Sequence, residues 1–278
     1  MGTQVMSTIN SFDIRGKVVL LTGGSGTLGK SMAKHLAVEG ARVVIVGRTA
    51  EKVKQTTESL QDSGAEALGF AGSVLDREFL VRVKDTVMET WGRIDALINA
   101  AGGNVAGATI GIEDSVFDMN MEDFRKVSEL NLDGSVLPSI VFGEVMAKQK
   151  KGSIINISSM TATQAVTRVV GYSASKAAID SFTRWMAVEM ATKFSPNIRV
   201  NAIAPGFFIA EQNRALLVNS DGSHTERGDA VIRKTPMKRF GNPEELNGVI
   251  HWLISDSSSF VTGAIVPIDG GFSAFSGV

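Results

Sequence analysis

Hydrophobic residues in this chain form short continuous runs that alternate with segments of helical periodicity. The first run, at residues 17–21, is apolar after its leading lysine, as is typical of a strand buried on both faces of a sheet. The same order of strand and helix recurs about every 25–30 residues, which predicts a parallel sheet with right-handed crossovers. Strands are predicted at 17–21, 41–46, 65–70, 94–98, 153–158, 198–203 and 264–267, and helices at 30–40, 50–63, 77–91, 121–149, 172–190 and 243–254.

This alternation is interrupted once, at about residues 207–239. We interpret that stretch as an insert that closes over the substrate as a lid. No linker, repeat or low-complexity tract divides the remainder of the chain. Residues 1–278 are therefore predicted to form one α/β domain.

Composition narrows the classes of function. A net charge of −1 gives no electrostatic reason to expect a nucleic acid or an anionic membrane as partner. The chain has no apolar run of about 18 residues, so no membrane span is predicted. It has no cysteine, and its three histidines lack the spacing of metal ligands, so no metal site is predicted. A cytoplasmic location fits the absence of cysteine.

Three residues suggest proton-transfer chemistry. Tyr172 is the only tyrosine in the chain, and Lys176 follows it by four residues, which on a helix places both side chains on one face. A nearby ammonium favours the phenolate, so we expect Lys176 to lower the pKa of Tyr172. Ser159, at the end of a predicted strand, could bring a hydroxyl to the same place. The set suits proton transfer to or from a substrate oxygen, although tyrosine and lysine one turn apart are also common on ordinary helices.

A glycine-rich turn between the first strand and the first helix predicts a dinucleotide site. Glycines there let the backbone approach a pyrophosphate, whose charge is stabilised by the helix N-terminus. Arg48 follows the second strand, where the adenosine ribose would lie, and no acidic residue occupies positions 46–49. A cation at that place accepts a 2′-phosphate, so we predict NADP(H) rather than NAD(H), with a solvated surface arginine as the alternative.

With these motifs the chain resembles the short-chain dehydrogenase/reductase family over essentially its full length. The resemblance implies a single Rossmann-like domain with a seven-stranded parallel sheet and helices on both faces, usually assembled as a homotetramer or dimer. The residues that carry it are Thr22-Gly23 with Gly29, Asn99-Ala100-Ala101-Gly102, Asn131, Ser159, Tyr172, Lys176 and Pro205-Gly206.

The resemblance also implies roles for individual residues. Tyr172 would be the general acid/base, and Ser159 would polarise the substrate oxygen. Lys176 would hold the nicotinamide ribose, and Asn131 would hold a water that connects Lys176 to solvent. The implied cofactor contacts are Gly23, Ser25, Thr27, Leu28, Gly29, Arg48, Ser73, Val74, Asn99, Ala100, Ala101, Gly102, Tyr172, Lys176, Pro205, Gly206 and Phe208.

The chain departs from the family pattern at three positions. Thr27 stands where the middle glycine of the turn is usual, which puts the shape of that turn in question. Ser73-Val74 follows Gly72 in place of the usual Asp-Val pair that contacts adenine. Ala210 replaces a threonine that often contacts the nicotinamide carboxamide.

A narrower resemblance concerns the second half of the chain. The segments NAIAPGFF, EQNRALL, TPMKRFG and DGGFSAFSGV are similar to the D-mannonate oxidoreductase (fructuronate reductase) branch of the family. That likeness implies a sugar-acid substrate, D-fructuronate or D-mannonate. Rival readings are a gluconate 5-dehydrogenase-like enzyme, a 3-oxoacyl carrier reductase, and a cofactor-sensing binding module without catalysis.

A sugar-acid site needs a cation for the carboxylate and polar groups for the hydroxyls. Arg214 is the first candidate for the cation, against a surface salt bridge, and Arg168 is the second. The predicted substrate contacts are Asn104, Ser159, Met160, Thr161, Gln164, Gln212, Asn213 and Arg214.

Overall fold

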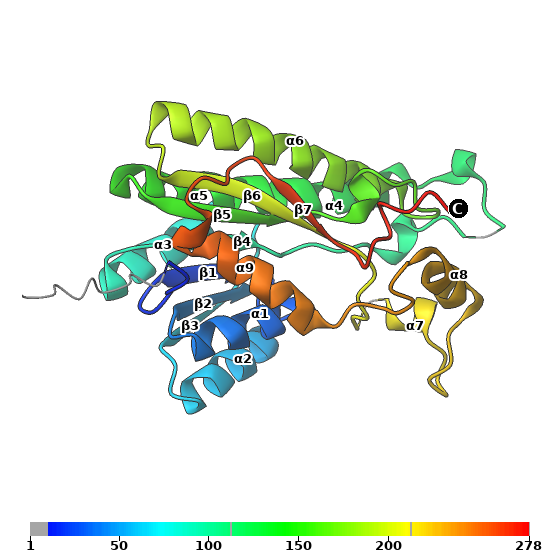
Figure 1. Cartoon of the computed structure of the whole chain (residues 1–278), viewed down its shortest axis with the longest axis horizontal. Coiled ribbons are helices and arrows are strands. Elements are labelled where there is room, and N and C mark those ends of the chain that lie inside the picture. The colour runs from blue at the N-terminus through cyan, green and yellow to red at the C-terminus, as the bar shows by residue number, and fades with distance from the viewer. Residues whose placement is uncertain (1–10, 112, 212, 278) are drawn as a thin grey trace, which may run out of the picture.

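A parallel sheet of seven strands forms the centre of the protein (Figure 1). The structure is a computed structural model that describes residues 11–111, 113–211 and 213–277. The strand order is β3-β2-β1-β4-β5-β6-β7, which confirms the predicted Rossmann-like fold. Each strand lies within two residues of its predicted bounds: β1 (Val18–Thr22), β2 (Arg42–Gly47), β3 (Ala67–Ala71), β4 (Ala96–Asn99), β5 (Gly152–Ile157), β6 (Ile198–Pro205) and β7 (Ile265–Ile268).

Helices cover both faces of the sheet and form two hydrophobic cores. Helices α1, α2 and α9 pack on one face, and α3, α5 and α6 pack on the other. Leu21 of β1, which is fully buried, pairs with Ile45 of β2 and Ile98 of β4, as expected for a central strand. The helices are α1 (Thr27–Val38), α2 (Ala50–Asp62), α3 (Arg77–Trp91), α4 (Met121–Ser128), α5 (Gly134–Gln149), α6 (Val170–Lys193), α7 (Arg214–Leu217), α8 (Glu226–Lys234) and α9 (Asn247–Ile254).

The strand order reverses direction at β1. Strands β2 and β3 extend from one side of β1, whereas β4 to β7 extend from the other. The connections after β1 and after β4 therefore diverge, which leaves a crevice at the carboxyl ends of these two strands. In open α/β sheets this crevice is where ligands bind, so the topology places the glycine-rich turn at a ligand site.

The helix predicted at 121–149 is not regular throughout. A π-helical turn, Glu129–Asp133, separates α4 from α5 and contains Asn131. Single π-helical turns inside α-helices are frequent at functional sites because they redirect a side chain relative to the helix on either side. The sequence pattern predicted the helix but not this turn.

The predicted insert lies beside the sheet. After β6 the chain forms α7 and α8, which Figure 1 shows on the same side of the molecule as the C-terminus. A short isolated bridge joins Val218 to His224 within this segment, and another joins Phe208 to Gly241, just after it. None of the helices among the described residues is both long and apolar enough to span a membrane.

Candidate active site

Ser159, Tyr172 and Lys176 are brought together by β5 and α6. Ser159 follows β5 and caps a short 3₁₀ turn, where its Oγ accepts a hydrogen bond from the Thr161 N–H at 3.2 Å. Helix α6 then carries Tyr172 and Lys176 one turn apart. Ser159 and Tyr172 line the same cavity, so the predicted hydroxyl and phenol face one site.

Lys176 is buried, with 4% of its surface exposed. Its Nζ donates a hydrogen bond to the Ile157 carbonyl oxygen at 2.7 Å, and lies 5.4 Å from the centre of the Tyr172 ring. Burial lowers the pKa of Lys176 to about 8, and the charge of Asp180 opposes that shift. The side chain is therefore mostly an ammonium at neutral pH.

The pKa of Tyr172 moves in the opposite direction from the one we expected. Burial raises it, because a phenolate loses hydration in the site, and a hydrogen bond with Ser159 only partly offsets that effect. The expectation that Lys176 lowers the pKa of Tyr172 is thus wrong. At neutral pH Tyr172 carries its proton, which suits a proton donor.

Asn131 is fully buried, and its amide is engaged with the protein. Its Nδ2 donates to the carbonyl oxygens of Gly103 and Val127 at 2.7 and 2.8 Å, and its Oδ1 accepts from the Gly103 N–H at 3.1 Å. A Cβ atom on Gly102 would lie 2.6 Å from Asn131 Oδ1 and 3.5 Å from Lys176 Nζ. Asn131 therefore holds the loop after β4 against the lysine. A role in relaying protons through water stays a prediction.

The glycine-rich turn fits close against the loop after β4. Gly23 has a positive φ of 66°, and a Cβ there would lie 2.5 Å from the Ala100 carbonyl oxygen. Thr22 Oγ1 accepts hydrogen bonds from the N–H groups of Ala100 and Ala101, both at 3.2 Å. The two loops thus form one surface at the crevice.

The N-terminus of α1 is open to an anion. No side chain within residues 11–111, 113–211 and 213–277 caps it, and its first turn contains no acidic residue. Because the first N–H groups of a helix have no partner within the helix, they can bind a pyrophosphate. Gly47, at the end of β2, leaves room for the Ser25 hydroxyl, which a Cβ would meet at 2.6 Å. These residues fit a dinucleotide.

The other predicted cofactor contacts are distributed around this surface. Thr27 and Arg48 are exposed, and Leu28 is half-buried. Ser73 is half-buried, while the Val74 side chain is buried, so a cofactor could meet only its backbone. The side chain of Asn99 turns inward, where its Nδ2 donates to Ser139 Oγ and Asn156 Oδ1 at 2.8 Å.

A cavity of about 600 Å³ extends from the catalytic side chains toward the insert. Among the predicted substrate residues, Asn104, Ser159, Met160, Thr161 and Asn213 line it. Among the described residues, the buried atoms Asn104 Oδ1 and Thr161 Oγ1 have no hydrogen-bond partner, although polar groups that are buried are normally paired. Both are therefore available to a bound molecule.

Arg168 and Arg227 supply the positive charge of this cavity. Arg168 Nε donates to the Ile110 carbonyl oxygen at 2.9 Å, and Arg227 bonds to the hydroxyl and carbonyl oxygens of Thr167 at 3.2 Å. Burial lowers the pKa of the Arg227 guanidinium, and the charge of Arg168 lowers it further. Neither guanidinium forms an ion pair with a carboxylate in the part of the chain that the structure describes.

Of the two predicted cations, only the second, Arg168, lines the cavity, and Arg227 joins it there. Arg214 is exposed and is not among the lining residues. The sequence missed Arg227, because no pattern separates it from the other arginines of the insert, Arg214, Arg233 and Arg239. Arg168, the second candidate from the sequence, does line the cavity, and its backbone φ of 78° is rare for a residue other than glycine.

Three further predicted residues have other positions. Gln164 does not line the cavity, and its Nε2 donates to the Ser273 carbonyl oxygen at 3.3 Å. Gln212 lies outside the described residues. Gly206 lines the cavity next to Pro205, which is buried at the end of β6.

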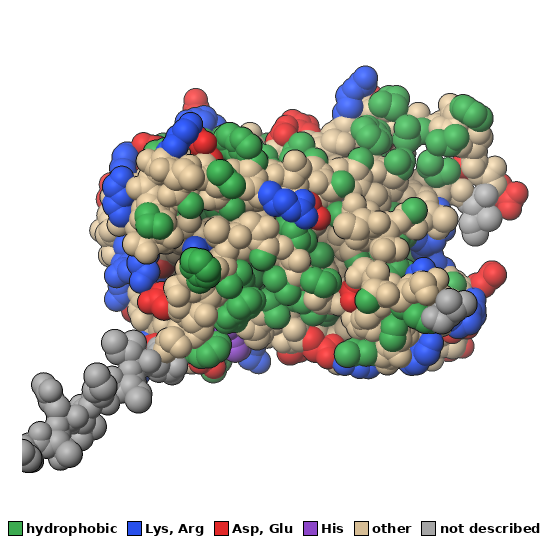
Figure 2. All heavy atoms as spheres, turned by 45° about the horizontal axis from the view of Figure 1, so that its top comes forward, with side chains coloured by type: hydrophobic (Ala, Val, Ile, Leu, Met, Phe, Trp, Pro, Cys, Tyr) green, Lys and Arg blue, Asp and Glu red, His purple; other side chains and the backbone are tan. Residues whose placement is uncertain are grey.

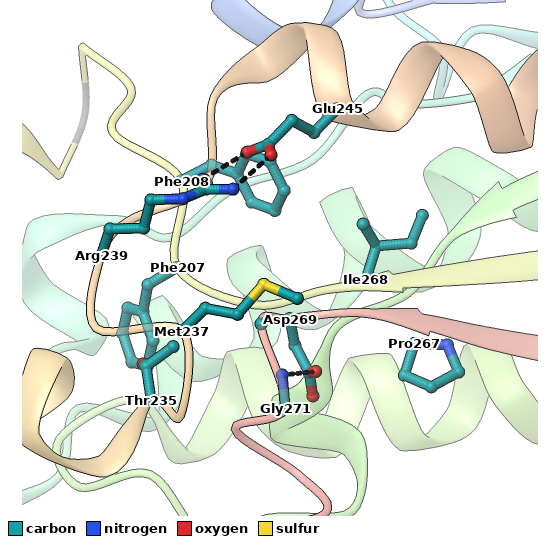
Figure 3. A pocket seen from close by; sticks show the side chains of 12 residues that line it. Phe207, Phe208, Thr235, Met237, Arg239, Glu245, Pro267, Ile268, Asp269 and Gly271 are labelled. Atoms are coloured by element: carbon teal, nitrogen blue, oxygen red, sulfur yellow. Dashed lines mark hydrogen bonds and ion pairs between the residues drawn. The ribbon is translucent and has the colours of Figure 1, made fainter.

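Phe208 is buried and lines a second cavity, of about 390 Å³, that Figure 3 shows. In that view Arg239 and Glu245 face each other as an ion pair with two contacts, at 2.6 and 2.7 Å. Phe207 lines both cavities, so the second cavity adjoins the catalytic one.

The face drawn in Figure 2 shows Lys and Arg side chains interspersed with Asp and Glu. No large basic patch stands out on this face. That distribution agrees with the nearly neutral charge of the chain.

Comparisons with known proteins agree with this geometry. A family model described as enoyl-(acyl carrier protein) reductase matches residues 24–273. The uncharacterized oxidoreductase UxuB of Bacillus subtilis is 46% identical over 275 residues, which cover 96% of this chain and 98% of that protein.

Two solved structures are similar throughout. One, from Haemophilus influenzae, is described as a candidate D-mannonate oxidoreductase with bound NAD; it has a TM-score of 0.89 and 38% identity, and the match covers 96% of this chain and 98% of that one. Another, from Beutenbergia cavernae, is described as a candidate NAD(P)-dependent gluconate 5-dehydrogenase with NADP at low occupancy. It has a TM-score of 0.83 and 30% identity over 95% of this chain and 100% of that one.

Proposed function

We propose that this chain, which belongs to the short-chain dehydrogenase/reductase family and is an NAD(P)-dependent oxidoreductase, acts on a sugar acid. The observation that carries this proposal is the pair of guanidinium groups in the catalytic cavity, Arg168 and Arg227, which have no carboxylate partner among the described residues. Two like charges held near each other repel, and an anionic ligand between them relieves that repulsion. A carboxylate fits, since it accepts paired hydrogen bonds from a guanidinium.

The rest of the cavity suits the polyhydroxylated part of such a molecule. Asn104 Oδ1 and Thr161 Oγ1, for which the described part of the chain offers no donor, can accept hydrogen bonds from sugar hydroxyls. Ser159 and Tyr172 lie at the same cavity, so a carbonyl carbon bound there lies within the reach of the catalytic groups. We name D-fructuronate, with D-mannonate as the reduced partner, because a similar structure is described as acting on D-mannonate.

The residues of the chain would divide the reaction as follows. The bound nicotinamide cofactor supplies or accepts the hydride. In the direction of reduction, Tyr172 donates its proton to the substrate oxygen, and Ser159 donates a hydrogen bond that holds this oxygen. The Lys176 ammonium stabilises the phenolate that remains on Tyr172. The raised pKa of Tyr172 keeps the proton on the donor until the substrate is bound.

We further propose a preference for NADP(H), which rests on Arg48. The side chain is exposed directly after β2, where the adenosine ribose would lie, and Gly47 precedes it. A 2′-phosphate would bond to this guanidinium, whereas a free ribose hydroxyl would prefer a carboxylate.

The segment at about 207–239 would serve as the substrate lid, since α8 brings Arg227 to the cavity. We also propose that the protein is a homotetramer or dimer. Ile140 of α5 and Trp185 and Val188 of α6 are 47%, 61% and 64% exposed, and burial of such side chains favours association.

Steady-state assays test the substrate and the cofactor together. D-fructuronate, D-tagaturonate and 5-ketogluconate are offered with NADPH and with NADH, and D-fructose serves as the control that lacks a carboxylate. We expect a sugar acid to give the highest kcat/KM, and NADPH to exceed NADH. Equal turnover of D-fructose would contradict the anionic substrate.

A gluconate 5-dehydrogenase-like activity is the second candidate, because one of the similar structures is described so. It shares the anionic substrate and would appear in the same assays as preferred turnover of 5-ketogluconate. A 3-oxoacyl carrier reductase would need a basic surface for its carrier, and the face in Figure 2 carries mixed charges instead. A cofactor sensor would have no use for the proton-transfer pair Tyr172 and Lys176.

A further inference from the structure

The carboxyl group of Asp180 is buried one helical turn after the catalytic lysine, Lys176. Asp180 follows Lys176 by one turn of α6 and is only 5% exposed. Aspartate is seldom buried without a charged or hydrogen-bonded partner, because ionised carboxylates lose much hydration energy. The reaction described above makes no use of this side chain.

Asp180 is bonded to the strand end that carries the active site. Its Oδ1 accepts a hydrogen bond from Ser158 Oγ at 2.5 Å, and Ser158 is 1% exposed. Ser158 stands between two functional neighbours. The carbonyl oxygen of Ile157, on one side, accepts the hydrogen bond from Lys176 Nζ, and Ser159, on the other, supplies the catalytic hydroxyl. Movement of Ser158 would displace both.

A neutral contact already joins the same strand and helix. Asn156 Nδ2 donates to Thr183 Oγ1 at 2.8 Å, two residues earlier on the strand and three residues later on the helix. A bridge between β5 and α6 therefore does not require a carboxylate. What distinguishes Asp180 from Thr183 is its negative charge.

That charge acts on Lys176. Among the described residues, the charged groups that act on Asp180 are Arg184 and Lys176, and Arg184 is exposed at the surface of α6. Lys176 is the buried one of the two. Its ammonium would otherwise be deprived of hydration with no counter-charge nearby.

We propose that Asp180 is a positioning residue for the reaction, which keeps Lys176 protonated through its charge and holds Ser158, and with it Ile157 and Ser159, in the catalytic arrangement. The proposal concerns the proton-transfer group alone and does not depend on which substrate is used.

The decisive variant is Asp180→Asn. The amide oxygen can still accept the hydrogen bond from Ser158, but the charge is lost. The pKa of Lys176 is measured in the full-length protein by competitive acetylation with acetic anhydride across pH, with the peptide that contains Lys176 quantified by mass spectrometry. We expect the pKa of Lys176 to fall below its wild-type value, and the alkaline limb of the kcat profile to move to lower pH by the same amount.

Glu189→Gln is the matched control, since it removes a carboxylate from the same helix where Glu189 pairs with Lys193 at the surface. Glu189→Gln should leave the pKa of Lys176 and the alkaline limb of the kcat profile unchanged. Asp180→Ala removes the hydrogen bond as well, and we expect kcat to fall about 10- to 100-fold with little change in KM, because the catalytic groups are displaced while the substrate cation site is intact.

A wild-type pKa of Lys176 in Asp180→Asn would overturn the proposal, even if the variant were less stable. If Asp180→Asn does not fold, Ser158→Ala tests the effect of the Asp180 charge on the pKa of Lys176. Burial raises the pKa of Asp180, and the hydrogen bond from Ser158 partly offsets that rise. Loss of the bond therefore raises the pKa of Asp180 further, which favours its neutral form and should also lower the pKa of Lys176. An unchanged value in that variant counts against the proposal equally. The acetylation measurement needs no substrate, so a failed sugar-acid assay and a failed role for Asp180 are separate results.

Discussion

The Nζ atom of Lys176 lies 5.4 Å from the centre of the Tyr172 ring, while its hydrogen bond goes to the backbone at Ile157. The ammonium is thus close enough to stabilise a phenolate, although its own hydrogen bond goes to the backbone and not to the phenol. Burial acts on both groups and favours their neutral forms, which raises the pKa of Tyr172 and lowers that of Lys176. Proton transfer therefore depends on what binds between them.

Tyr172→Phe removes the proton donor and keeps the ring. We expect kcat to fall about 10²- to 10⁴-fold, which is the usual contribution of a general acid. Cofactor affinity, measured by the quenching of tryptophan fluorescence, should stay close to that of the wild type. Turnover that survived this substitution would exclude Tyr172 as the acid.

The pKa of Lys176 predicts a dependence of stability on pH. The unfolded lysine keeps its proton up to about pH 10.5, whereas the folded one releases it near pH 8. Between these values the unfolded state binds more protons, so the contribution of Lys176 to the free energy of unfolding rises with pH, by about 3 kcal/mol in total. The comparison is between wild type and Lys176→Met, by urea unfolding at pH 7.5 and pH 10. A difference between the two proteins that does not change with pH would contradict the buried ammonium.

Gly29→Ala should disrupt the cofactor site, because a Cβ there would run into the backbone of Gly23. Overpacking of this kind costs about 1–3 kcal/mol, which corresponds to a loss of cofactor affinity of about 5- to 150-fold. Gly26→Ala is the matched control. Its Cβ would lie 3.3 Å from the Gly23 carbonyl oxygen, and its φ of −83° suits alanine. Isothermal titration with NADPH compares the two, and equal affinities would exclude the proposed turn.

Arg227→Gln should raise KM for a sugar acid about 10- to 100-fold, since a charge-assisted hydrogen bond contributes about 1.5–3 kcal/mol. Arg233→Gln, in the same helix but exposed, is the control and should have no effect. Arg214→Gln separates the two candidate cations. If this variant raises KM and Arg227→Gln does not, the carboxylate is bound as the sequence alone predicted.

Lys150→Gly tests a strained helix end away from the site. Lys150 ends α5 in the left-handed conformation, with φ of 59°, which glycine adopts without a steric penalty. We expect the free energy of unfolding to rise by about 1 kcal/mol, and the Tm by about 2–4 °C. The Lys150 ammonium bonds to the Phe194 carbonyl oxygen at 3.2 Å, so Lys150→Ala, which loses that bond without relief of strain, is the control and should be destabilised. A lower Tm for Lys150→Gly would show that this bond outweighs the strain.

The sheet could be predicted from the sequence because a strand that is buried on both faces is apolar at every position, which is a local pattern. Continuous apolar runs such as the one at β1 are recognisable without knowledge of their neighbours. Tyr172 and Lys176 could be paired because helix geometry alone places residues four apart on one face. The glycine turn could be located because it joins a predicted strand to a predicted helix.

Only the tertiary structure determines which polar and charged side chains come together at the active site. Arg227 reaches the catalytic cavity from α8, and Asp180 of α6 accepts a hydrogen bond from Ser158, the residue after β5. Neither contact follows from the periodicity of a single helix or strand. The shift of the Tyr172 pKa likewise follows from how much water the folded chain excludes, which no spacing of residues records. Local periodicity therefore determined the scaffold and the proton-transfer pair, whereas the electrostatics of the site depend on long-range packing, because charge interactions and hydration are set by distance in space.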